Sequence, residues 1–242
     1  EDIENCTGDT AIALSRIADN GQFFEVKADY GKSVAVGFIR LNGATVGAVA
    51  NRSESYDVEG KKVWESDGTL SARGARKAAE FVKFCDAFEI PVLTLTNVNG
   101  FKATVCGEKM MAKSVGALVH AFADATVPKV NVVIGKAFGT AYTAMNSKAI
   151  GADMVYAWEN AEIGMMDADL AAKIMYAGDD AAALTEKAAE YRELQNSVSS
   201  AAARGYVDTI ISPADTRKYV IGAFEMLFTK REERPSKKHG TV

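Results

Sequence analysis

From residue 70 onward, apolar segments and helix-periodic segments alternate along the chain, with glycine-containing turns between them. The apolar segments PVLTLTNV, VPKVNVVIG and ADMVYAW have the length of strands, and helical patterns separate them. Strands that alternate with helices favour an α/β fold with largely parallel pairing, because each helix returns the chain to the same end of the sheet. With 242 residues, 48% of them hydrophobic, the chain can bury the core of one such globular unit.

The first 69 residues predict a helix and then a group of strands. DTAIALSRIADN has helical periodicity and ends at Gly21, while FFEVKA, VAVGFIRLNG and ATVGAVAN have the composition of strands. The dipeptide Asn42-Gly43 separates the last two of these strands and is a strong signal for a tight hairpin. The next segment, RSESYDVEGKKVWESDG, is polar and poorly periodic, so we expect an irregular surface excursion.

The helix-periodic segments after residue 70 predict the crossovers and the C-terminal helices. They are SARGARKAAEFVKFCDAFE, EKMMAKSVGALVHAFADA, AYTAMNSKAI ending at Ile150, ADLAAKIMYA, DDAAALTEKAAEYRELQNSVSSAA and PADTRKYVIGAFEMLFTK. AEIGMM and YVDTIIS predict short strands, and residues 230–242 predict a polar, extended tail. The residues that we expect to fill the core include Cys85, Met110, Met111, Met165 and Met166.

Charge and composition exclude several classes of function. A net charge of −4 leaves no basic field to hold nucleic acid, so no nucleic-acid partner is expected. Three cysteines and two histidines show no metal-ligand spacing, so no metal site is expected. No apolar run has the length of a membrane span and no signal peptide opens the chain, which predicts a reduced, cytoplasmic protein. The chain begins at Glu1 without methionine, and we expect it to be a piece of a longer polypeptide.

The segment KAFGTAYTAM, which follows a predicted strand and opens a predicted helix, is the strongest candidate site. Its turn, Gly139-Thr140-Ala141, contains no acid, base or nucleophile, but the first N–H groups of a helix lack partners within the helix. Two such groups aimed at one point form an oxyanion hole, and small residues leave room for the ligand. Ordinary strand-to-helix turns also favour glycine and small residues, and the turn taken alone fits that alternative better.

Six segments, spread in order over nearly the whole chain, carry a resemblance to a known family. They are GFIRLNGATVGAVAN, AAEFVKFCDAFEIPVLTLTNVNGF, HAFADATVPKVNVVIGKAFGTAYTAMNSK, DMVYAWENAEIGMM, AAARGYVDTIISPADTRKYV and RPSKKHG. Together they resemble the C-terminal half of the carboxyltransferase subunits of biotin-dependent acyl-CoA carboxylases and decarboxylases, which belong to the crotonase superfamily.

The resemblance implies a fold and an activity. The fold would be an α/β, ClpP/crotonase-type superhelix of β-β-α turns with C-terminal helices, and residues 1–242 would form one C-terminal carboxyltransferase domain. The activity would be carboxyl transfer between biotin and the CoA thioester of an acyl group. The implied partners are the N-terminal carboxyltransferase half, a biotin carboxyl carrier protein, further copies in a trimer-based ring and, in a decarboxylase, membrane subunits.

The resemblance also implies which residues form the site. The catalytic oxyanion hole would consist of the backbone N–H groups of Thr140 and Ala141, next to Gly139. The residues implied to contact biotin or the acyl substrate are Asn99, Gly100, Phe101, Phe138, Tyr142, Thr143 and Asp167. Since two separate halves would build the site, an isolated chain should expose an apolar patch on the order of several hundred Å².

The chain departs from the family pattern at several of these positions. Thr140 replaces a glycine, Asn99 replaces a proline, and Asp167 stands where the family has glycine. Asp167 could therefore add a carboxylate to the site or act as a helix N-cap. Two other functions stay open, namely a catalytically silent assembly subunit and a stand-alone crotonase-fold acyl-CoA hydrolase or hydratase.

Overall fold

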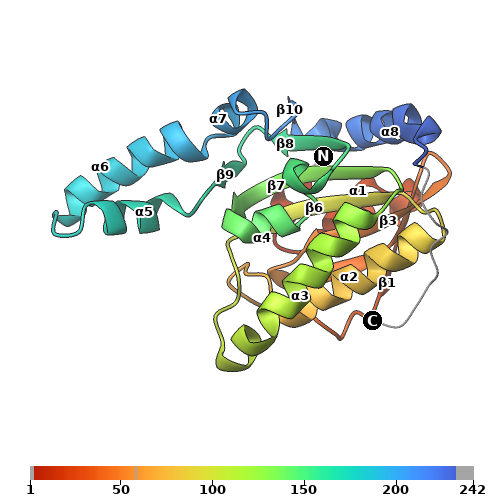
Figure 1. Ribbon diagram of the computed structural model, residues 1–242, viewed down its shortest axis with the longest axis horizontal. Coiled ribbons are helices and arrows are strands. Elements are labelled where there is room, and N and C mark those ends of the chain that lie inside the picture. The colour runs from red at the N-terminus through yellow and green to blue at the C-terminus, as the bar shows by residue number, and fades with distance from the viewer. Residues whose placement is uncertain (1–2, 58, 233–242) are drawn as a thin grey trace.

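A mixed β-sheet forms the centre of the computed structural model, which describes residues 3–57 and 59–232 (Figure 1). The described part of this sheet has eight strands, in the order β1-β2-β3-β6-β7-β8-β10, with β9 paired to β7. They are β1 (Phe23–Val26), β2 (Val34–Leu41), β3 (Ala44–Asn51), β6 (Val92–Val98), β7 (Lys129–Phe138), β8 (Met154–Trp158), β9 (Glu162–Gly164) and β10 (Thr209–Ile211). β1, β2 and β3 pair antiparallel, whereas β3, β6, β7, β8 and β10 pair in parallel.

Helices cover both faces of this sheet (Figure 1). The α-helices of the described residues are α1 (Thr10–Ile17), α2 (Ala72–Ala87), α3 (Val105–Asp124), α4 (Gly139–Ala144), α5 (Ala168–Met175), α6 (Ala181–Tyr191), α7 (Val198–Ala203) and α8 (Thr216–Met226), and of these α5 and α6 extend away from the sheet. The strand–helix alternation predicted from the sequence is confirmed, and so is the parallel pairing from β3 onward.

Side chains alternate between two hydrophobic cores, one on each face of the sheet. On β6, Leu93 and Leu95 enter the cluster that packs against α1 and α8, whereas Val92 and Val98 enter the cluster formed with α2 and α3. Cys85 of α2 is fully buried in the second cluster, as predicted, and burial raises the pKa of its thiol to about 12. The cysteine is therefore a packing residue rather than a nucleophile at neutral pH.

The hairpin between β2 and β3 has the geometry that its sequence predicts. Asn42 and Gly43 have φ values of 53° and 80°, and both lie in the left-handed region that a type I′ turn requires. The carboxylate of Asp19 accepts hydrogen bonds from both of their N–H groups, at 3.1 Å and 2.8 Å. This contact ties the turn to the end of the first helical segment.

Two predicted elements have different boundaries in the structure. The helix predicted for residues 141–150 is wrong beyond Ala144, where α4 ends. Asn146 then adopts a left-handed φ of 54°, and its buried side-chain amide donates to Thr94 Oγ1 at 3.2 Å, so the chain leaves the helical path. The long helix predicted for residues 179–202 is also interrupted, because a π-helical turn at 192–196 leads to an extended Ser197.

Further corrections concern residues at the surface. The segment expected to be irregular contains a small hairpin of β4 (Glu54–Tyr56) and β5 (Lys62–Glu65). Two of the methionines expected in the core, Met110 and Met165, are exposed instead. In the predicted tail, residues 230–232 have no regular secondary structure, and the rest of that tail lies outside the described residues.

Lys77 of α2 is a buried cation beneath the sheet. Only 1% of this residue is exposed, and its ammonium group donates to the carbonyl oxygen of Val34 at 2.8 Å. Glu25 Oε1 lies 4.0 Å from the nitrogen. Burial outweighs this nearby carboxylate and lowers the pKa of Lys77 to about 8.

The buried ammonium group predicts a pH-dependent stability. The unfolded chain holds the Lys77 proton up to about pH 10.4, whereas the folded chain releases it from about pH 8. Unfolding therefore takes up a proton between these pH values, and the free energy of unfolding rises with pH by up to about 1.4 kcal/mol per pH unit. Urea titrations at pH 8, 9 and 10 should show this rise in the difference between wild type and Lys77→Met. A difference that is independent of pH would contradict it.

Candidate functional site

The carboxyl ends of β6 and β7 lie next to each other and bring together residues that are distant in sequence. In the parallel register Val98 lies opposite Ala137, so the segments that follow, beginning at Asn99 and Phe138, leave the same edge of the sheet. β9 extends this edge, because Gly164 pairs with Phe138 and the chain then reaches Asp167. The structure thus gathers the three predicted parts of the site at one edge.

The turn that enters α4 presents its amide groups without a capping side chain. Gly139 has a φ of +61°, which disfavours any residue with a Cβ, and an added Cβ would lie 3.1 Å from the Met165 carbonyl oxygen. Phe138 occupies the N-cap position and contributes no side-chain hydrogen bond, so the first-turn N–H groups stay available. Thr140 is exposed, while Ala141 is 1% exposed. The turn therefore combines an exposed residue, Thr140, with a buried anchor, Ala141.

The other predicted residues of α4 point in different directions. Tyr142 packs in the core behind the turn, where its hydroxyl has no partner among the described residues and burial raises its pKa to about 12. Thr143 is half-buried, and its hydroxyl donates to the Gly139 carbonyl oxygen at 3.5 Å. Tyr142 therefore supports the turn from the core side, whereas Thr143 keeps part of its surface open.

The segment Asn99–Phe101 is held in place by the chain before α2. Asn99 donates its side-chain amide to the Asp67 carbonyl oxygen at 2.7 Å, and its backbone N–H donates to Gly68 at 3.0 Å. The Gly100 carbonyl oxygen accepts from the N–H of Leu70 at 2.8 Å. These contacts fix the loop after β6 beside the turn of α4.

Asp167 is the N-cap of α5 and also pairs with a lysine of β7. Its Oδ1 accepts from the Asp169 N–H at 3.0 Å, and its Oδ2 lies 3.1 Å from the ammonium nitrogen of Lys136. Partial burial opposes ionisation, but the hydrogen bond and charge of Lys136 lower the pKa of Asp167 overall. Asp167 thus caps α5 and also places a carboxylate beside the candidate site, so both interpretations of this residue have a geometric basis.

Two positioning residues were missed by the sequence interpretation. Lys136 lies two residues before Phe138 on the same face of β7, with its nitrogen 5.9 Å from the Phe138 ring centre. Asn97 accepts from the Lys136 N–H at 3.0 Å and donates to Thr7 at 3.0 Å, at a bulge where β7 gains residues over β6. The alternation of side chains along β7 could have indicated Lys136, because it places Lys136 on the same face as Phe138. No local sequence signal predicts that Asn97, 39 residues away, accepts from Lys136 at the bulge.

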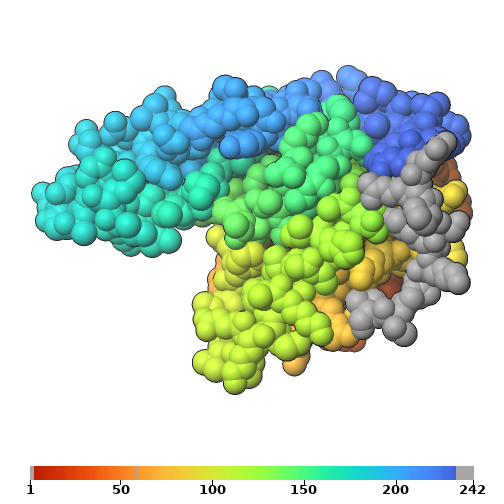
Figure 2. All heavy atoms as spheres, viewed as in Figure 1, coloured from red at the N-terminus to blue at the C-terminus, as the bar shows by residue number. Residues whose placement is uncertain are grey.

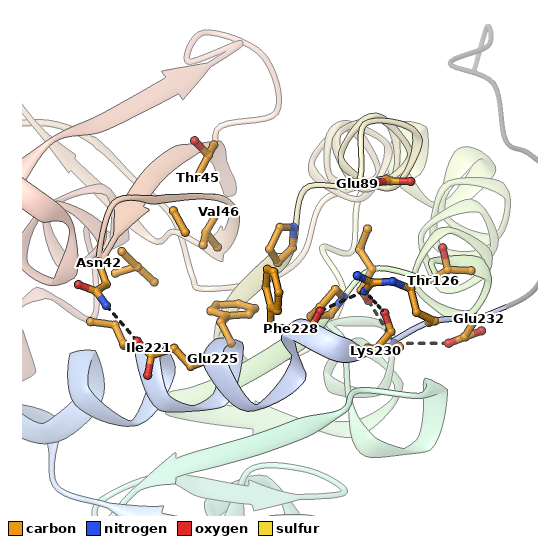
Figure 3. A pocket seen from close by; sticks show the side chains of 17 residues that line it. Asn42, Thr45, Val46, Glu89, Thr126, Ile221, Glu225, Phe228, Lys230 and Glu232 are labelled. Atoms are coloured by element: carbon orange, nitrogen blue, oxygen red, sulfur yellow. Dashed lines mark hydrogen bonds and ion pairs between the residues drawn. The ribbon is translucent and has the colours of Figure 1, made fainter.

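A cavity of about 640 Å³ lies at the opposite edge of the sheet, between the amino ends of β6 and β7 and the end of α8 (Figure 3). None of the predicted site residues lines it. Lys230, on its wall, already pairs with Asp153 at 2.9 Å and donates to Val127 at 3.2 Å. Because ligands of open α/β sheets bind at the carboxyl ends of the strands, we place the candidate site at the turn of α4 rather than in this cavity.

Two other kinds of site were sought in the described part of the chain. Residues 3–57 and 59–232 bring together no group of three or more histidine, cysteine or acidic side chains that could hold a metal ion. Within the same ranges no helix combines the length and the apolar character needed to cross a membrane.

Comparison with known proteins identifies relatives along the whole chain. Residues 3–242 match the carboxyl transferase domain family. The methylmalonyl-CoA carboxyltransferase 12S subunit of Propionibacterium freudenreichii is 43% identical over 239 residues, covering 96% of this chain and 44% of that subunit. The propionyl-CoA carboxylase beta chain of Roseobacter denitrificans is 40% identical over 244 residues, covering 100% of this chain and 46% of that relative.

A solved structure agrees with these relatives. The crystal structure of transcarboxylase 12S, described as a hexamer with hydrolysed methylmalonyl-coenzyme A bound, superposes with a TM-score of 0.84 at 43% identity. It covers 96% of this chain and 44% of the 12S chain. The fold is thus the crotonase-like fold of carboxyltransferases, as the sequence predicts, and the chain spans a little under half the length of these relatives.

The left-handed turn predicts a contrast between two glycines. Gly139→Ala should lower the free energy of unfolding by about 1–2 kcal/mol, because a residue with a Cβ is strained at a φ of +61°. Gly116→Ala, in the middle of α3 with open space around it, should instead raise stability by up to about 1 kcal/mol. Urea denaturation of both variants measures the contrast. Equal effects would mean that the turn is not strained in the way described.

Proposed function

Because this chain belongs to the carboxyl transferase domain family, we propose that it supplies the biotin-facing half of an acyl-CoA carboxyltransferase site. The observation that carries the proposal is the turn of α4 at the carboxyl edge of the sheet, where no side chain caps the first amide groups and Thr140 is exposed. Relatives named for propionyl-CoA and methylmalonyl-CoA support a short-chain acyl-CoA as the substrate. In this proposal residues 1–242 act as one domain, and the other half of the site comes from a partner.

In the proposed mechanism, the amides of Thr140 and Ala141 hold the oxygen that gains negative charge as the carboxyl group is transferred. Biotin, attached to a carrier protein, would carry that carboxyl group. Hydrogen-bond donors fixed in advance stabilise such a charge without the cost of reorganising solvent. Gly139 fits this role because it leaves the approach to the donors free of a Cβ. The turn then has to supply neither a nucleophile nor a general base.

Other residues of the edge would position the ligand. Asn99, Gly100 and Phe101 form the neighbouring wall, and Phe138 and Thr143 flank the turn. Lys136 and Asp167 would hold the entrance of α5 in place through their ion pair. The proposed partners are the N-terminal carboxyltransferase half, the biotin carrier, further copies of the chain and, for decarboxylation, membrane subunits.

Direct binding separates this proposal from its alternatives. Calorimetry with free biotin or a biotinylated carrier protein should give a signal for a carboxyltransferase half, but none for a silent assembly subunit or a stand-alone hydratase. A hydratase would also require a positioned acid and base, and the Gly139–Ala144 helix carries neither. Absence of binding by the chain, alone and together with its other half, would overturn the proposal.

Two variants of Thr140 separate the backbone amide from the side chain. Thr140→Pro removes one proposed donor in the first turn of α4, where the N–H has no helical partner and the residue is exposed. With the missing half supplied by the part of the Propionibacterium 12S subunit that this chain does not cover, kcat should fall by about 10²- to 10³-fold. Thr140→Ala keeps the amide and should stay near wild type, with melting temperatures of both variants as the control. An inactive Thr140→Ala in a folded protein would assign the function to the hydroxyl instead.

Thr143 should influence which acyl group is accepted. Added bulk at this half-buried position narrows the space beside the turn, and one methylene group typically changes specificity by about 10- to 200-fold. Thr143→Ile should therefore shift the relative kcat/KM for acetyl-, propionyl- and butyryl-CoA. Thr185→Ile is a matched control on α6, since Thr185 also donates to the carbonyl oxygen four residues earlier. Unchanged ratios in Thr143→Ile would remove this residue from the acyl pocket.

A further inference from the structure

α5 and α6 form an arm, residues 167–196, that extends away from the sheet and its two cores (Figures 1 and 2). The two helices pack against each other, and the arm returns to the body through the π-helical turn at 192–196. The fully buried residues of the two helices are all small, namely Ala168, Ala171, Ala172 and Ala188. None of these alanines belongs to the two cores formed by the described residues.

The outer face of α5 is apolar as well. Leu170 and Ile174 stand one helical turn apart, and at 100° per residue they lie on the side opposite to the alanines. They are 51% and 60% exposed, and Met175 at the end of the helix is 59% exposed. A helix that is apolar on both sides is stable when both sides are covered, and α6 covers only one. Large apolar side chains grouped on an exposed helix mark an interaction surface rather than scattered surface residues.

The base of the arm is held rigidly against the candidate site. Asn196 is fully buried, donates to the Met166 carbonyl oxygen at 2.9 Å, and fills the space that a Cβ on Gly164 would occupy. Arg192 lies within 3.6 Å of both Glu162 and Asp169, which links the two helices to β9. An arm fixed in this way presents its apolar face in one orientation, which lowers the entropic cost of binding a partner.

The arm starts where the proposed catalytic turn lies. Its first residue, Asp167, pairs with Lys136 of β7, and the Met165 carbonyl oxygen lies 3.1 Å from where a Cβ on Gly139 would be. A protein bound along α5 would therefore lie beside the amides of Thr140 and Ala141. The same contact would cover the apolar face and close one side of the site.

The charge of the arm restricts the kind of partner. Its acidic residues are Asp167, Asp169, Asp179, Asp180, Glu186, Glu190 and Glu193, and its basic residues are Lys173, Lys187 and Arg192. This acidic excess opposes binding to an anionic membrane and opposes pairing with the same arm of a second copy. The relatives, by contrast, contain a further part, a little over half of their own length, that this chain does not cover.

We propose that the apolar face of α5, defined by Leu170 and Ile174, is the docking surface for the other carboxyltransferase half. This inference rests on the proposed function and names the partner of its site. The partner surface would be apolar opposite Leu170 and Ile174, and neutral or basic around them. Binding there would complete the site next to Thr140. The same contact would therefore be needed for association of the two halves and for catalysis.

The test measures association separately from catalysis. The probe is the part of the Propionibacterium 12S subunit that this chain does not cover, and its binding to the chain is followed by sedimentation velocity. Leu170→Ser with Ile174→Ser should weaken binding by about tenfold or more, as expected for apolar anchors at the centre of an interface. The matched control, Met226→Ser with Phe228→Ser, changes two exposed apolar residues at the far end of the molecule and should leave affinity unchanged (Figure 1).

Two further measurements keep the outcomes distinct. Leu170→Ala with Ile174→Ala keeps strong helix formers in α5 and should weaken binding in the same direction, with circular dichroism confirming the helices. Full affinity in both arm variants, or no association of the unaltered chain with the probe, would overturn the docking surface. Association that depends on the arm but gives no carboxyl transfer would contradict the proposed function and leave the docking surface in place.

Discussion

The parallel register of β6 against β7 sets Val98 beside Ala137 and so brings two loops to one edge of the sheet, although α3 separates the two strands in the sequence. Parallel strands require such a crossover, and α3 provides it while covering one core. The bulge at Asn97 then adjusts where β7 ends relative to β6. Every other part of the candidate site is placed relative to this edge.

The position of α4 follows from interactions at both of its ends. At its start, Gly139 takes a left-handed conformation, and the Met165 carbonyl oxygen, just after β9, lies 3.1 Å from where a Cβ on Gly139 would be, so no larger residue fits there. After its end, Asn146 donates to Thr94, and Thr96 donates to Asn131 at 2.8 Å, all within the buried interior. Buried polar groups tolerate few arrangements because each unpaired group costs about 1–3 kcal/mol. The short helix is thus fixed by polar contacts rather than by its own length.

The molecule divides into a body with two large cores and an arm with an alanine interior. Burial of apolar area is the main source of stability, so the body can hold its shape with little help from the arm. The arm buries little and exposes Leu170 and Ile174, which leaves the edge beside Thr140 open on one side. This division agrees with a chain that matches a little under half the length of its relatives. A site shared between two halves needs one surface that stays uncovered until the halves meet.

The sequence by itself determined the α/β class, the hairpin at Asn42-Gly43, the alternation of strands and helices after residue 70, and the family, because hydrophobic period, turn chemistry and extended motifs are local properties. It also indicated the turn at Gly139, although its role there is a proposal. Only the tertiary structure decided where α4 ends, that Lys136 pairs with Asp167, and that Met165 and Ile174 are exposed. Those features depend on contacts between residues far apart in the chain, such as Asn146 with Thr94. The helical pattern of α5 predicts which faces of the helix are apolar. Which of these faces packs against another element is decided by the packing of the whole fold.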